Sequence, residues 1–329
     1  MKRINNCVSA AGLKILFCSL PFLFFCACGF CQTEQISSSI DKQSFIYAVK
    51  DTNQLGLDVY TLRGSDSILK KPTILFVFGG AFIAGRRDDT LYNRYFNSLV
   101  EHNYNVVSIS YRLGMKGVKN VSKFNIAPLR NAIDMAVEDV YDATNWIIDH
   151  AGQFGVDDSK IILSGSSSGA ITVLNADYDR RNDHLISNKL PGNFEYAGVV
   201  SFSGAVLSFD WGLKYNMAPA PMLLFHGTAD KIVPYNKIGF LNKGFYGSGW
   251  IAKICRENNY PFYLYSEAGL GHEVSVYPMY ENLPTILDFI ETYIVEKKPL
   301  QIDYYIKDST IKPVMLLTPE ELFKKLQQQ

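Results

Sequence analysis

The chain has 329 residues, of which 47% are apolar and 19% charged, and 32 basic side chains balance 32 acidic ones. This balance argues against a nucleic-acid-binding protein, because such a protein needs a surplus of positive charge to release counterions from phosphates. The apolar fraction is typical of a globular chain with a large core and excludes a mainly disordered one.

The first 31 residues are predicted to be a bacterial-style secretion signal. Lys2 and Arg3 precede an apolar run at 15–25, and small residues follow it. Such a run is too short to span a bilayer but suits the apolar part of a signal peptide. The stretch FCAC at 25–28 weakly resembles a lipobox, so lipidation of Cys28 is an alternative; a buried or membrane-anchoring segment is another. We expect an exported protein, secreted or periplasmic, or lipid-anchored at the cell envelope.

Cysteine usage agrees with export. Five of the six cysteines lie in or at the end of the N-terminal segment, and only Cys255 lies well inside the remaining chain. A single thiol cannot form an internal disulfide, so the fold must be stabilised by its core. The sequence contains neither paired CxxC motifs nor HExxH, and we therefore predict no metal site.

Beyond this segment, predicted strands and helices alternate. Runs rich in β-forming residues at 44–51 and 57–62 flank an Asn-Gln pair, which predicts an antiparallel hairpin. Continuous apolar runs at 73–78 and 105–111 are typical of strands buried on both faces of a parallel sheet. Further strands are predicted at 160–164, 197–202, 222–225 and 261–266.

A long helix is predicted after the strand at 105–111, because apolar residues recur there at three- and four-residue steps. They are Ile133, Ala136, Val140, Ala143 and Ile147. Other helices are predicted after Ser167 and at 286–296. This alternation predicts an α/β fold with one doubly wound, mostly parallel sheet and helices on both faces.

The alternation defines a main domain at 32–298. The tail at 299–329 departs from the pattern and is predicted to be a C-terminal extension, to which the sequence assigns no role. Within it, Thr318 and Pro319 resemble a helix start, with threonine as the N-cap and proline at the first helical position.

The stretch Gly165-Ser166-Ser167-Ser168-Gly169 matches the pattern G-x-S-x-G, with a predicted strand before it and a helix after it. A serine at a sharp strand-to-helix turn exposes its hydroxyl above the sheet, and small flanking residues permit the turn. A plain Gly/Ser turn is the alternative. The strand and helix on either side favour a nucleophile at Ser167.

A serine nucleophile needs a base, because its hydroxyl is protonated at neutral pH. Among the five histidines, His272 follows the last apolar strand, at the sheet edge where open α/β sheets bind ligands. His226 ends a strand, and Asp230 lies in the loop after it. The chain order Ser167, Asp230, His272 is that of α/β-hydrolase sheets. We predict that His272 is the base and that Asp230 orients it.

Two glycines, Gly79 and Gly80, follow the apolar strand at 73–78. Glycine allows a backbone N–H to point at a developing oxyanion. The N–H groups of Gly79, Gly80 and Ser168 are therefore predicted to form an oxyanion hole, with Ala81 as a further candidate donor. A Gly-Gly turn that only ends the strand is the alternative.

Together, these stretches resemble the α/β-hydrolase superfamily, and most of all its secreted carboxylesterase and acetyl-esterase branch related to hormone-sensitive lipase. The matching stretches are FGGAF at 78–82, SYR at 110–112, FGVDDSKIILSGSSSGA at 154–170, HGTADKIVP at 226–234 and GHE at 271–273. The resemblance implies a serine–histidine–aspartate triad that requires no cofactor. Phe78 departs from the family, which usually has histidine there to support the oxyanion loop; this departure puts the support of that loop in doubt, not the triad.

The resemblance implies a serine carboxylic-ester hydrolase for short-acyl esters, such as acetyl or feruloyl groups on carbohydrates. Its partner would be a small-molecule or carbohydrate ester and not a nucleic acid, with membrane contact only through a lipid on Cys28. Loops at 85–89 and 113–130 are expected to border the pocket, with Phe82 and Phe124 as candidates for an aromatic wall or for the core. A serine peptidase or amidase, and a catalytically silent fold used for binding, are the alternatives.

Overall fold

The computed structural model describes residues 39–65, 67–119, 125–308, 310–314 and 317–326. The predicted signal at 1–31, the predicted lipidation site Cys28 and the pocket candidate Phe124 lie outside these ranges. Within the ranges, no helix is long and apolar enough to cross a membrane.

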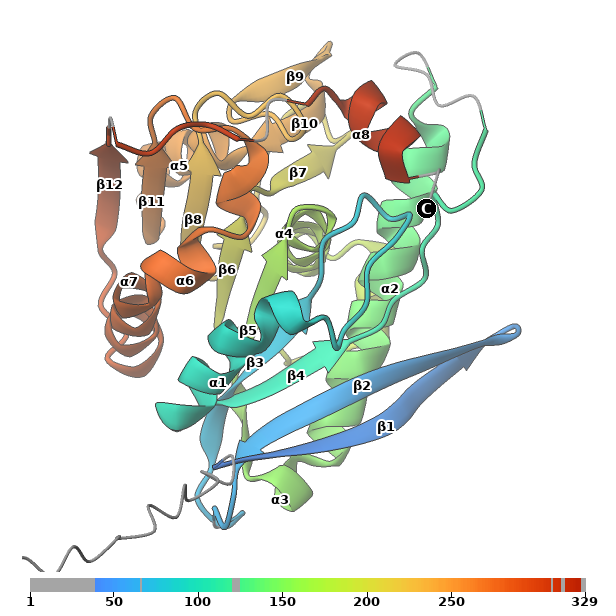
Figure 1. The fold of residues 1–329 in the computed structure, drawn as a ribbon, viewed down its shortest axis with the longest axis vertical. Coiled ribbons are helices and arrows are strands. Elements are labelled where there is room, and N and C mark those ends of the chain that lie inside the picture. The colour runs from blue at the N-terminus through green and yellow to red at the C-terminus, as the bar shows by residue number, and fades with distance from the viewer. Residues whose placement is uncertain (1–38, 66, 120–124, 309, 315–316, 327–329) are drawn as a thin grey trace, which may run out of the picture. The chain divides into compact units, whose positions relative to one another are not determined.

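A nine-stranded sheet runs through the described chain (Figure 1). In spatial order its strands are β1 (Ile40–Lys50), β2 (Asn53–Leu62), β4 (Asn105–Ile109), β3 (Lys71–Val77), β5 (Val156–Ser166), β6 (Gly198–Phe202), β8 (Met222–Gly227), β11 (Phe262–Glu267) and β12 (Gln301–Ile306). The pairs β1–β2 and β2–β4 are antiparallel, and all pairs from β4 to β12 are parallel. The predicted α/β class, the mostly parallel sheet and the N-terminal hairpin are confirmed.

Helices lie on both faces of this sheet (Figure 1). One group packs together as α1 (Asn93–Glu101), α6 (Pro278–Glu281) and α7 (Leu283–Phe289), and another contains α2 (Ala127–Asp149) and α4 (Ser168–Arg181). The remaining helices are α3 (Ala151–Phe154), α5 (Ser248–Glu257) and α8 (Pro319–Leu326), with shorter turns at Thr90–Tyr92, Leu185–Lys189 and His272–Ser275. A π-helical segment at Ile290–Val295 continues α7, so that the two together correspond to the helix predicted at 286–296. The long helix predicted from the apolar spacing is α2.

The hairpin turn lies two residues earlier than the sequence predicts. The last pair of the ladder is Lys50 with Asn53, so the turn consists of Asp51 and Thr52. Asp51 has a φ of 53°, the left-handed conformation that a two-residue hairpin turn requires and that aspartate tolerates. The Asn-Gln pair therefore begins β2 instead of forming the turn.

The inner parallel strands β4, β3, β5, β6 and β8 are largely buried, whereas the edge strand β12 is mostly exposed. In β3, the run Ile74 to Val77 is fully buried, as its continuous apolar sequence predicts. The end of β4 is linked to α2 by Arg112, whose Nε lies 2.9 Å from Oδ1 of Asp139, a fully buried carboxylate. Breaking such a buried pair by removing one partner is strongly destabilising, and the link therefore fixes α2 against this strand.

The sequence did not predict several elements. The tail after residue 298 contributes β12, which pairs in parallel with β11 and so joins the sheet. A small antiparallel sheet has the order β7 (Ala205–Ser208), β10 (Lys243–Gly247) and β9 (Lys237–Phe240). In the remaining tail, α8 begins as predicted: the Thr318 hydroxyl accepts the Glu321 N–H at 3.3 Å, and the Glu321 carboxylate accepts the Thr318 N–H at 2.7 Å.

Candidate active site

Ser167 occupies the turn between β5 and α4, with φ 52° and ψ −116°. Non-glycine residues rarely adopt this conformation, which costs roughly 1–3 kcal/mol. The tight packing around the turn explains the flanking glycines. A Cβ on Gly165 would lie 2.4 Å from the Gly169 carbonyl oxygen, and a Cβ on Gly169 would lie 2.0 Å from that of Val77. Close backbone packing therefore holds Ser167 in the strained turn.

His272 lies beside this serine. Oγ of Ser167 is 2.7 Å from Nε2 of His272, and the imidazole is almost completely buried. His272 follows β11, which is next to β8 and parallel to it. The loops after these two strands therefore leave the same edge of the sheet, and Nδ1 of His272 lies 2.8 Å from Oδ2 of Asp230 in the loop after β8. The three residues proposed from chain order thus form one hydrogen-bonded row.

Asp230 is held on both carboxylate oxygens. Oδ1 accepts the N–H groups of Ile232 at 2.8 Å and Val233 at 3.0 Å, while Oδ2 faces His272. Burial alone would raise the pKa of Asp230, but hydrogen bonds from His226 and His272 outweigh it and hold the pKa well below its usual range. The carboxylate is therefore ionised at neutral pH and fixed in orientation.

His226 is a neighbour of Asp230 that the sequence did not single out. Its imidazole is fully buried, and its Nε2 lies 3.4 Å from Oδ2 of Asp230. The signal that could have found it is its place four residues before Asp230, at the end of the strand that leads into the same loop.

The glycine turn after β3 adopts left-handed conformations. Gly80 has φ 138°, and Ala81 and Phe82 have φ values of 55° and 59°. A Cβ on Gly80 would lie 2.0 Å from the Ala84 carbonyl oxygen, so this position requires glycine. The N–H of Gly79 donates to the Tyr92 hydroxyl at 3.2 Å. One of the three predicted oxyanion donors is therefore already paired with a side chain.

A second tyrosine supports the same turn. The Tyr111 hydroxyl donates to the Phe78 carbonyl at 3.0 Å and lies 3.3 Å from Oγ of Ser168. The rings of Phe78 and Tyr111 pack with centroids 4.5 Å apart. Burial raises the pKa of Tyr111 well above its usual range, so the hydroxyl keeps its proton and can donate. Tyr92 and Tyr111 therefore hold this loop, in which Phe78 stands at the position where the resemblance led us to expect histidine.

Three side chains of the predicted pocket wall have structural partners. Phe82 is in the buried core. Nε of Arg87 lies 3.0 Å from Oδ1 of the buried Asp58, and Arg86 is 70% exposed and pairs with Asp88 in its own loop. Each of the two arginines is thus paired with a carboxylate of the protein itself, and neither needs an anionic substrate as a partner.

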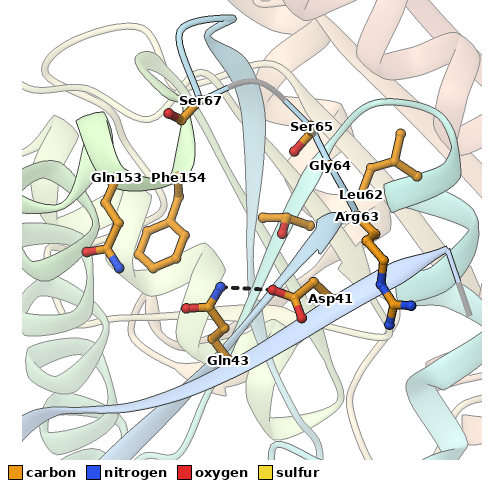
Figure 2. A pocket seen from close by; sticks show the side chains of 10 residues that line it. Asp41, Gln43, Leu62, Arg63, Gly64, Ser65, Ser67, Gln153 and Phe154 are labelled. Carbon is orange, nitrogen blue, oxygen red and sulfur yellow. Dashed lines mark hydrogen bonds between the residues drawn. The ribbon is translucent and has the colours of Figure 1, made fainter.

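Figure 2 shows a hollow of about 200 Å³ at the N-terminal hairpin. Its lining includes Asp41, Gln43, Ser65, Gln153 and Phe154, and Gln43 donates to Asp41, two residues before it in β1, at 2.9 Å. It contains none of the residues proposed for catalysis, so the hydrogen-bonded row and not this hollow defines the candidate site. Over the described ranges, no group of three or more His, Cys, Asp or Glu residues is arranged to hold a metal ion.

Comparison with known proteins agrees with this architecture. Residues 57–211 match the family model described as BD-FAE. Lipase 1 of Geotrichum candidum is 31% identical over 163 residues, covering 49% of this chain and 27% of the relative. Esterase B1 of Culex pipiens is 30% identical over 132 residues, covering 40% of this chain and 22% of the relative. The chain thus spans less than a third of the length of these curated relatives.

Among solved structures, a propionate-bound esterase from Thermogutta terrifontis superposes with a TM-score of 0.57. It is 20% identical and covers 79% of this chain and 96% of its own. The sheet order, the strand–serine–helix turn and this superposition define an α/β-hydrolase fold. The chain thus has the α/β-hydrolase fold, and the relatives named above are lipases and esterases. The predicted relation to hormone-sensitive lipase stays a prediction.

Proposed function

We propose that this protein is a serine carboxylic-ester hydrolase. The observation that carries the proposal is the buried row from Oγ of Ser167 through the imidazole of His272 to Asp230, with contacts of 2.7 Å and 2.8 Å. The esterase and lipase relatives support the choice of esters over other acyl compounds. The match to BD-FAE over 57–211 includes Ser167 but neither Asp230 nor His272, so the geometry supplies the rest of the argument.

In the proposed reaction, Ser167 attacks the ester carbonyl carbon while Nε2 of His272 takes the hydroxyl proton. The ionised Asp230 accepts the Nδ1–H, which fixes the imidazole tautomer and stabilises the imidazolium. His272 then gives its proton to the leaving alkoxide as the carbon–oxygen bond breaks. A water molecule, deprotonated by the same imidazole, attacks the acyl-enzyme and releases the acid and Ser167.

We assign the oxyanion hole to backbone N–H groups of Gly80, Ala81 and Ser168. Ser168 is the first residue of α4, where a backbone N–H has no partner within the helix and the helix dipole favours negative charge. Gly79 was also predicted, but its N–H would have to exchange the Tyr92 hydroxyl for the substrate oxygen. In this assignment Gly79 positions the loop and the next two residues bind the oxyanion.

The proposed substrates are short-acyl esters, with acetyl and feruloyl groups on carbohydrates as the natural candidates. The superfamily resemblance and the predicted export signal support this choice, since an exported esterase meets extracellular polysaccharides. Export itself, with or without a lipid on Cys28, remains part of the proposal. The domain from 32 to 298 would carry the activity, and β12 would extend its sheet.

The function is tested by hydrolysis of p-nitrophenyl acetate, butyrate and decanoate. We expect rapid acetate cleavage, and a loss of several orders of magnitude in Ser167→Ala. The matched control is Ser187→Ala, which also removes a buried serine hydroxyl, but one that donates to the His184 carbonyl, and it should keep most of the activity. Faster cleavage of decanoate than of acetate would overturn the short-acyl assignment. Cleavage of an aminoacyl-nitroanilide but of no ester would favour a peptidase.

A further inference from the structure

Two histidines contact one oxygen of Asp230. Oδ2 lies 2.8 Å from Nδ1 of His272 and 3.4 Å from Nε2 of His226. His226 ends β8 and is fully buried. Its Nδ1 lies 2.8 Å from Oγ of Ser248, the first residue of α5. The row of three residues therefore continues through Asp230 to His226 and Ser248.

The hydrogen-bond partners of His226 determine which of its ring nitrogens carries the hydrogen. Nε2 faces Oδ2 of Asp230 and, at 3.2 Å, the Val233 carbonyl oxygen. A carboxylate and a carbonyl oxygen are acceptors only, so Nε2 must carry the hydrogen. The Ser248 hydroxyl can donate to Nδ1. A neutral imidazole protonated on Nε2 thus satisfies every contact, and Ser248 fixes this tautomer.

We propose that His226 is a positioning residue of the active site, which holds the Asp230 carboxylate and shares its negative charge with His272. This inference rests on the proposed esterase function. A carboxylate oxygen that faces two imidazole N–H groups, here at 2.8 Å and 3.4 Å, stabilises positive charge on either imidazole less than it would if it faced that imidazole alone. With His226 present, Asp230 therefore stabilises the imidazolium of His272 less. Without His226, the full charge of Oδ2 acts on His272.

Two other titratable side chains belong to this part of the site: Tyr235, which packs against His226, and Glu273, which follows His272 in the chain. The Tyr235 ring packs edge-on with centroids 5.6 Å apart, and its hydroxyl lies 2.7 Å from Oγ of Ser266. Burial raises the pKa of Tyr235, so it stays neutral. On the side of His272, the neighbouring Glu273 accepts the Gly271 N–H at 2.8 Å. Among the described residues, Asp230 is therefore the ionised group that contacts His226.

The test is the pH profile of kcat/KM for p-nitrophenyl acetate in full-length wild type, His226→Leu, His226→Gln and Ser248→Ala. In His226→Leu we expect the acid limb to move up by roughly half to one pH unit. We also expect kcat to fall about tenfold. Glutamine places an amide donor near the position of Nε2 and should restore the limb. Ser248→Ala should shift it by a smaller amount in the same direction.

His184→Leu is the matched control, because it also removes a histidine that contacts an aspartate, with Nδ1 2.7 Å from Oδ1 of Asp179. Its acid limb should match wild type. An unmoved limb in an active His226→Leu, or no rescue by glutamine, contradicts the inference. If the leucine variant does not fold, an unmoved limb in Ser248→Ala contradicts it instead. A wild type inactive on every ester overturns the proposed function and this inference with it.

Discussion

Tyr111 links the two parts of the site that meet the substrate carbonyl in the proposed reaction. Its hydroxyl contacts the Phe78 carbonyl, next to the glycine turn, and Oγ of Ser168, next to the nucleophile. A single side chain therefore sets the spacing between the backbone donors in the loop after β3 and the donor at the start of α4. Hydrogen-bond donors that are placed to bind the oxyanion of the transition state contribute strongly to catalysis, and small displacements of these donors lower the catalytic rate.

Tyr111→Phe should reduce kcat for acetate esters about tenfold while leaving KM nearly unchanged, because the donors lose their fixed spacing. The free energy of unfolding should fall by about 1 kcal/mol for the lost hydrogen bond. Steady-state kinetics and urea unfolding measure the two effects.

Tyr141→Phe is the matched control for this substitution. It also deletes a buried tyrosine hydroxyl, which donates to the Ala176 carbonyl at 2.7 Å on the far part of α4. It should lose similar stability but keep wild-type kcat. Equal kcat values for the two variants would refute a positioning role for Tyr111.

The sequence predicted the three residues of the row but not their supports. Ser167 stands in a motif, and chain order then ranks Asp230 and His272. Tyr111 and His226 lie in the matching stretches SYR and HGTADKIVP, and Tyr92 lies in none of them. None of the three could be given its role from the sequence, because each contacts a residue on another strand or loop. Their roles depend on which strands are adjacent and in which register, and this information is not contained in local spacing.

At the scale of elements, the site depends on how closely α4 approaches β3. A Cβ on Gly169 would lie 2.0 Å from the Val77 carbonyl oxygen and 2.6 Å from that of Phe78. Both are backbone atoms at the end of β3, so they cannot rotate away as a side chain could.

Gly169→Ala should therefore lower the free energy of unfolding by about 3 kcal/mol. Its activity should also fall, since the first turn of α4 must move away from the oxyanion loop. Chemical denaturation and acetate hydrolysis report the two losses.

Gly152→Ala provides the comparison for that variant. Gly152 lies in α3, and a Cβ there meets no atom within 4 Å. Because alanine favours helix, this change should be neutral or add up to about 1 kcal/mol. A Gly169→Ala protein as stable as wild type would show that the approach of α4 to β3 is looser than described.

Some elements were beyond prediction for physical reasons. The parallel core strands are continuous apolar runs, and such runs can be recognised in the sequence without knowing which strands lie beside them. By contrast, β9 and β10 are short, rich in glycine and lysine, and pair mainly with each other and β7. The edge strand β12 is largely exposed and alternates polar with apolar residues, so only its pairing with β11 identifies it.

At the scale of the whole molecule, Ser38–Gln329 forms one compact unit that contains a single cysteine. Cys255 is fully buried, and burial raises the pKa of its thiol to about 12. The thiolate that reacts with disulfide reagents is therefore both scarce and inaccessible in the folded protein.

We expect a chain that begins at residue 38 to show no fast reaction with a disulfide reagent until urea unfolds it, when one thiol should react. Thiol reactivity and circular dichroism should then give the same unfolding midpoint, and a reductant should leave that midpoint unchanged. Fast labelling of native protein would contradict the burial of α5 against the sheet.

The most direct test of the central claim is covalent labelling with a fluorophosphonate, followed by peptide mass spectrometry of wild type and His272→Gln. A fluorophosphonate modifies a serine that a neighbouring base has activated. The account predicts one label in the wild type, on the peptide that contains Ser167, and very slow labelling in the variant. A label on a different residue, or ester hydrolysis that continues with Ser167 unmodified, would contradict it.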